Sequence, residues 1–69
     1  MQILKINGKE KQFPHGLPKT LMELLKQMDI NHATVVAEIN GKIIERQNFS
    51  QTQLRNGQKI ELVRFVGGG

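Results

Sequence analysis

Cysteine is absent from this chain of 69 residues, and so are tryptophan and tyrosine. The lack of cysteine excludes a disulfide framework, a thiolate zinc site and a cysteine nucleophile. It is compatible with a reducing cytoplasm, where we expect the protein to work. No apolar run approaches the roughly 18 residues of a membrane-spanning helix, and no signal peptide opens the chain. We therefore expect no association with a membrane.

Residues that carry metal, catalytic or nucleic-acid chemistry are scarce as well. The two histidines, His15 and His32, have no second ligand at metal-binding spacing and are interpreted as loop residues. Three phenylalanines are the whole aromatic content, which is thin for a base-stacking platform. Ten lysines and arginines against six acids give a net charge of +4, but they form no run. We expect no catalytic residue, no metal site and no nucleic-acid partner; the charge favours solubility and attraction to an acidic protein surface.

Alternating apolar residues and turn dipeptides predict five strands in one small domain. The predicted strands are Met1–Ile6, Lys9–Phe13, Val35–Ile39, Lys42–Arg46 and Lys59–Phe65. Asn-Gly pairs at 7–8 and 40–41 are hairpin signals, and a third pair at 56–57 marks a turn. The second strand is polar, which suits a sheet edge, and the first and last strands are the candidates for the centre.

A short helix is predicted to start at Thr20 and to end near Met28 or Asp29. Thr20 and Glu23 fit a capping box, in which Glu23 reaches back to the N-cap backbone. Leu21, Leu24, Leu25 and Met28 form one apolar stripe, which we assign to the core. Residues 47–53 are predicted as a loop or one helical turn, with Leu54 closing the open end of the sheet. Two hairpins flanking a helix give an α+β fold.

The last predicted strand is apolar on both faces. Ile60 and Leu62 share one face, and Val63 and Phe65 share the other with Glu61. One helix covers one face of a sheet, so Val63 and Phe65 are expected to be exposed and to form a partner interface. The alternative is that loops cover them.

The last four residues of the sequence are Val66, Gly67, Gly68 and Gly69. We expect residues 66–69 to form a flexible tail on a domain of residues 1–65. Extended, four residues reach roughly 13 Å. The tail is thin enough to enter a partner's active site, and its chemical group is the α-carboxylate of Gly69, which must be activated before acyl transfer. A linker or expression scar is the alternative interpretation of the glycines.

Taken together, these residues resemble the ThiS family, the sulfur carrier proteins of thiamine biosynthesis. The resemblance covers the whole chain, and its most specific parts are Val-Val-Ala-Glu-Ile-Asn-Gly-Lys-Ile-Ile and the ending Ile-Glu-Leu-Val-Arg-Phe-Val-Gly-Gly-Gly. It implies a ubiquitin-like β-grasp: a mixed sheet of about five strands with one helix packed on one face. Many relatives are acidic, whereas this chain is basic, which leaves the electrostatics of its partners open.

The resemblance also implies a reaction and its partners. An E1-like ThiS adenylyltransferase would adenylate Gly69 with ATP, and a sulfur donor system would convert the adenylate to a thiocarboxylate. Thiazole synthase would then take that sulfur into the thiazole ring of thiamine. The chain would be a cosubstrate with no bound cofactor, not an enzyme, since ATP is used by the activating partner.

Three alternatives remain open on the residues alone. The small subunit of molybdopterin synthase also carries sulfur on a terminal Gly-Gly, although its tail usually follows a proline-containing stretch that is missing here. A ubiquitin-like modifier would end in an isopeptide instead of a thioacid. A plain binding module with a flexible scar would not need its glycines.

Overall fold

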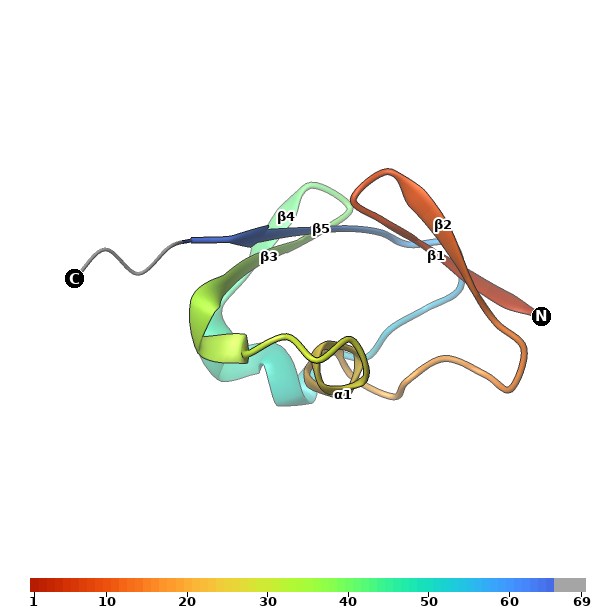
Figure 1. Ribbon diagram of the computed structural model, residues 1–69, viewed down its shortest axis with the longest axis horizontal. Coiled ribbons are helices and arrows are strands. Elements are labelled where there is room, and N and C mark those ends of the chain that lie inside the picture. The colour runs from red at the N-terminus through yellow and green to blue at the C-terminus, as the bar shows by residue number, and fades with distance from the viewer. Residues whose placement is uncertain (66–69) are drawn as a thin grey trace.

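The computed structural model describes residues 1–65, in which a five-stranded mixed sheet is covered on one face by a short helix (Figure 1). The strands are β1 (Gln2–Ile6), β2 (Lys9–Phe13), β3 (Val35–Ile39), β4 (Lys42–Ile44) and β5 (Lys59–Arg64). The helix is α1 (Leu21–Gln27), and two 3-10 helices, η1 (His32–Thr34) and η2 (Arg46–Gln51), follow it. The predicted α+β class is confirmed.

The sheet order is β2-β1-β5-β3-β4, so the last strand of the chain is inserted between the two hairpins. β5 runs parallel to β1 and antiparallel to β3, and both hairpin pairs are antiparallel. The predictions that β2 lies at an edge and that the first and last strands lie centrally are confirmed. The N-terminus and the C-terminal end of β5 lie at opposite ends of the molecule (Figure 1).

Both predicted hairpin turns have left-handed backbone. Asn7 and Gly8 have φ angles of 50° and 83°, and Asn40 and Gly41 have 51° and 83°. Asparagine and glycine tolerate this region better than other residues, and two successive positive φ angles match the twist of a two-residue hairpin. The two dipeptides therefore set the registers of β1 with β2 and of β3 with β4.

The start of α1 confirms the N-cap but corrects one half of the capping box. Thr20 is extended, and its Oγ1 accepts the Glu23 N–H at 3.3 Å. The Glu23 carboxylate accepts the backbone N–H of Lys19 at 3.1 Å, one residue before the N-cap. The first bond satisfies a donor that the first helical turn leaves free, and the second satisfies a backbone donor just outside the helix. The helix ends at Gln27, with Met28 as its C-cap.

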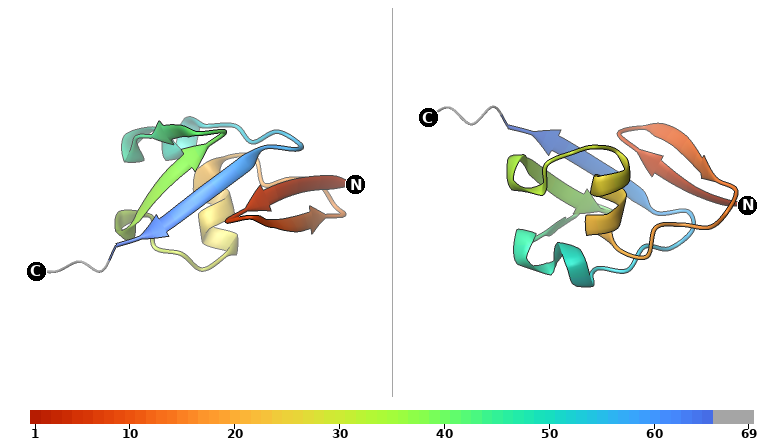
Figure 2. Two further views of the ribbon diagram at one scale, coloured as in Figure 1. Left: turned by 90° about the horizontal axis from the view of Figure 1, so that it is seen from above. Right: turned by 60° about the horizontal axis from the view of Figure 1, so that its bottom comes forward.

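One hydrophobic core lies between the sheet and α1, and η2 packs beside α1 on the same side (Figure 2, right). The predicted stripe is confirmed: Leu21, Leu24 and Leu25 are fully buried, and Met28 is partly buried against them. The buried set is Leu4, Ile6, Phe13, Leu21, Leu24, Leu25, Val35, Ala37, Ile39, Phe49, Ile60 and Leu62.

The segment after β4 departs from prediction. The fourth strand was expected over Lys42–Arg46, but it ends at Ile44, and Arg46 begins η2. β4 has three register partners in β3, and the chain then leaves the edge so that Phe49 reaches the core. Phe49 is 1% exposed and is the largest fully buried side chain, whereas Leu54 is partly buried. The first and last strands are also one residue shorter than predicted: β1 begins at Gln2, and β5 ends at Arg64.

Candidate functional site

The candidate site is the sheet face opposite α1, together with the end of β5. Figure 2 (left) views this face from above, and the described residues place no helix in front of β3 and β5. Ile60 and Leu62 are buried, while Val63 is 59% exposed and Phe65 is 42% exposed. The predicted exposure of Val63 and Phe65 is confirmed, and their role in a partner interface remains a prediction.

Neighbouring strands enlarge this face beyond the residues predicted from sequence. Val63 pairs with Val36 of β3, which is 39% exposed. Ile43 of β4 is also exposed and lies across from Glu38. We call Val36, Ile43, Val63 and Phe65 the outer patch. Val36 and Ile43 were missed because their proximity to β5 follows from the sheet order, which no local pattern specifies.

Hydrogen bonds to the backbone of β5 hold the strand in place near its end. On one side β3 pairs with it as far as Val35 and Arg64, and the Phe65 N–H donates to the Thr34 carbonyl at 3.1 Å. On the other side the Asn7 side chain bonds both backbone groups of Leu62, at 2.7 Å to its N–H and 3.2 Å to its carbonyl. The strand that leads to the predicted tail is thus anchored from two sides.

The predicted reacting end itself lies outside the described residues. Val66, Gly67, Gly68 and Gly69 belong to this part of the chain, so the role of Gly69 and the boundary between residues 1–65 and 66–69 stay predictions. The structure describes the chain as far as the residue that precedes them. Phe65, the last described residue, directly follows β5 at the exposed face.

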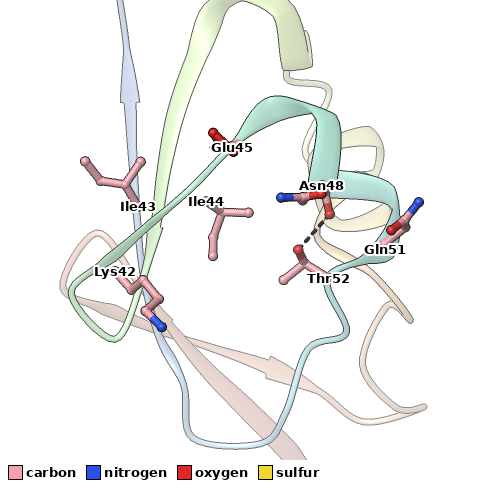
Figure 3. Close-up of a pocket in the computed structure, with 7 residues that line it drawn as sticks. All are labelled: Lys42, Ile43, Ile44, Glu45, Asn48, Gln51 and Thr52. Atoms are coloured by element: carbon pink, nitrogen blue, oxygen red, sulfur yellow. Dashed lines mark hydrogen bonds between the residues drawn. The ribbon is translucent and has the colours of Figure 1, made fainter.

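A groove of about 530 Å³ lies between β4 and η2, away from the end of β5 (Figure 3). Its lining residues are Lys42, Ile43, Ile44, Glu45, Asn48, Gln51 and Thr52. The Thr52 hydroxyl donates to the Asn48 backbone carbonyl at 2.7 Å. With Lys42 and Glu45 as its charged residues, the groove has no constellation for acid–base catalysis.

Residues 1–65 contain no group of three or more His, Cys, Asp or Glu side chains that could hold a metal ion. None of their helices has the length and apolar character needed to cross a membrane.

Sheet order, the single covering helix of the described residues and the exposed opposite face define a ubiquitin-like β-grasp protein. The sequence model of the ThiS family matches residues 2–69, and the chain belongs to this family. The sulfur carrier protein ThiS of Bacillus subtilis is 31% identical over 67 residues, covering 97% of this chain and 100% of that protein. A crystal structure of the thiamine biosynthesis protein ThiS from Geobacter metallireducens superposes with a TM-score of 0.82 at 32% identity, covering 97% and 99% of the two chains.

A larger protein contains a similar segment. A thiazole synthase from Paramagnetospirillum magneticum is 33% identical over 66 residues, which are 96% of this chain but 20% of that protein. The chain thus corresponds to about a fifth of the synthase.

Proposed function

We propose that this chain is a sulfur carrier protein of thiamine synthesis, acting as a cosubstrate and not as a catalyst. The observation that carries the proposal is the match to ThiS sulfur carriers over essentially the full length of both chains. The β-grasp fold with a free outer face is consistent with it, because a carrier must be recognised by several enzymes in turn.

The reacting group in this proposal is the α-carboxylate of Gly69. Its oxygen attacks the α-phosphorus of ATP in the active site of an E1-like adenylyltransferase, and pyrophosphate leaves. A sulfur nucleophile at the oxidation level of hydrosulfide then attacks the acyl carbon, and AMP leaves. The product is a thiocarboxylate, a sulfur nucleophile that thiazole synthase uses. ATP is bound by the partner, and the carrier supplies no acid, base or metal to these steps.

The outer patch is the proposed contact with the activating enzyme. Val63 and Phe65 lie just before residues 66–69 in the chain. A partner that binds these two side chains therefore also positions Val66 to Gly69. Aromatic side chains such as that of Phe65 are enriched at the centre of interfaces, where a few residues carry most of the binding energy. The same face is free for thiazole synthase once the activating enzyme has dissociated.

Thiazole synthase as the recipient is supported by the similar segment in the Paramagnetospirillum synthase. A carrier-like segment within a synthase chain keeps sulfur donor and acceptor at a high effective concentration. We place the separate carrier in the cytoplasm, with ATP and the enzymes that act on it.

ATP–pyrophosphate exchange with the activating enzyme tests the proposal. Wild type with Gly69 as its last residue should support exchange, and deletion of Gly69 or addition of one alanine should abolish it. The extension moves the carboxylate about 3.5 Å, and misplacement by about 1 Å already costs around a hundredfold in rate. An N-terminal tag is the control, since the N-terminus lies at the opposite end of the molecule from the end of β5 (Figure 1). Exchange by the extended protein at the wild-type rate would refute the role of Gly69.

A further inference from the structure

The outer face of the sheet places two glutamates opposite each other and two lysines opposite each other. Glu38 of β3 lies directly opposite Glu61 of β5, and we call this pair the acidic row. Lys5 of β1 is the register partner of Lys59 of β5, and we call this pair the basic row. On its other side Lys5 lies opposite Glu10 of β2, an opposite charge within the chain. Like charges directly opposite each other destabilise a sheet, whereas opposite charges in the same positions stabilise it. The acidic row is therefore unfavourable for the fold, whereas the repulsion in the basic row is offset at Lys5 by Glu10.

The two rows and an apolar row follow one another along β5. Lys59, Glu61 and Val63 occupy every second position, so successive rows lie roughly 7 Å apart at a rise of about 3.3 Å per residue. Val63 pairs with Val36 beyond the acidic row, and Ile43 borders Glu38 on the side of β4. Toward the end of β5, the face thus presents a basic row, then an acidic row, then apolar side chains.

The charge of the acidic row is opposite in sign to the net charge of the chain. A net charge of +4 favours a partner with an acidic surface, but such a surface alone would repel Glu38 and Glu61 where they meet it. Glu38 is only partly exposed, so a protein covering it would remove its remaining contact with water. Burying an unpaired charge is costly, so the covering surface must offer a cation there.

We propose that the activating enzyme docks on this face with a basic side chain against the acidic row and an acidic side chain against Lys59 of the basic row. The inference rests on the proposed function, because that function requires the enzyme. An apolar contact has no direction along the strand, whereas an ordered pair of opposite charges fixes register and orientation. Orientation matters here because β5 must point its C-terminal end into the partner's active site.

Two variants test the rows, and a third is the matched control. Glu61→Gln removes one charge from the acidic row. The fourfold variant Lys5→Glu, Glu38→Lys, Lys59→Glu, Glu61→Lys exchanges the two rows and leaves the composition and the net charge of +4 unchanged. Asp29→Asn removes one charge just after α1, on the covered side of the sheet, where the φ of 59° also suits asparagine.

The readouts are pyrophosphate exchange against carrier concentration and the melting temperature. Glu61→Gln should raise KM roughly tenfold with kcat near the wild-type value, as expected for loss of one close interfacial charge pair. It should not lower the melting temperature, because it relieves repulsion. The row exchange should raise KM about a hundredfold or more, and Asp29→Asn should behave as wild type.

The inference is overturned if Glu61→Gln has the KM of Asp29→Asn, or if a folded row-exchange variant saturates like wild type. Should the fourfold variant fail to fold, Glu61→Gln alone decides the matter. If wild type itself supports no exchange, the proposed function is refuted and the inference falls with it. Normal exchange by wild type with unaffected variants refutes the inference alone.

Discussion

Asn7 offers a sharp prediction, because its side chain bonds both backbone groups of one residue in the central strand. Its Oδ1 accepts the Leu62 N–H at 2.7 Å, and its Nδ2 donates to the Leu62 carbonyl at 3.2 Å. The register of β1 with β5 covers Lys5 with Lys59 and Ile6 with Ile60. The Asn7 amide therefore continues the ladder past the end of β1 and fixes β5 close to the predicted tail.

Asn7→Gly removes both bonds and keeps a residue that accepts the φ of 50°. At about 1 kcal/mol for each hydrogen bond, the free energy of unfolding should fall by about 2 kcal/mol. A domain of this size has roughly 3–5 kcal/mol to lose, so the melting temperature should drop by about 8–16 °C. Asn40→Gly is the matched control: its φ is 51°, and its side chain accepts one bond, from Lys59 N–H at 2.9 Å. It should cost about half as much.

Urea unfolding followed by far-ultraviolet circular dichroism is the assay, since the chain has no tryptophan or tyrosine to report by fluorescence. Both variants introduce the same extra flexibility into the unfolded chain, so the difference between them isolates the additional bond. A loss for Asn7→Gly no greater than that for Asn40→Gly would refute the reasoning.

Three further substitutions separate docking from folding. Phe65→Ala should weaken activation and leave the melting temperature nearly unchanged, because Phe65 is 42% exposed; unfolding by this change would place Phe65 in the core instead. Thr20→Ala should cost about 1 kcal/mol in urea unfolding as an N-cap loss, with sulfur transfer well below the melting temperature unaffected; loss of transfer in a folded protein would assign the helix start to a partner contact. Phe49→Ala should cost about 3–5 kcal/mol, close to the whole stability, and a sharp thermal transition near that of wild type would contradict the burial of Phe49.

Local patterns were sufficient for most of the fold. Asn-Gly pairs with φ near 50° and 83° mark both hairpins, and alternation groups Ile60 and Leu62 on one face of the last strand, the face that is buried. Both signals act over a few residues, so they can be recognised in one sequence. The exposure of Val63 and Phe65 followed from the same alternation. The single predicted helix can cover only one face of the sheet, so the face that carries these two residues was expected to be exposed.

Features that depend on distant pairing could not be predicted. Glu38 faces Glu61 because β5 is inserted beside β3 in one register, and neither strand encodes that register by itself. The contact between Asn7 and Leu62 spans 55 positions. In the sequence, Asn7 looks like an ordinary turn residue, so nothing local indicates this contact. The early end of β4 at Ile44 reflects the gain from burying Phe49, a tertiary effect that overrides the strand propensity of the segment.

The most direct test of the sulfur carrier role is intact mass spectrometry of the protein after incubation with ATP, the activating enzyme and a sulfur donor. The mass should increase by the difference between one sulfur and one oxygen atom, and fragmentation should locate the increase at Gly69. Omission of ATP should leave the mass unchanged. An unchanged mass in the complete reaction, or a sulfur located anywhere else in the chain, would contradict the assignment of Gly69 as the sulfur-carrying residue.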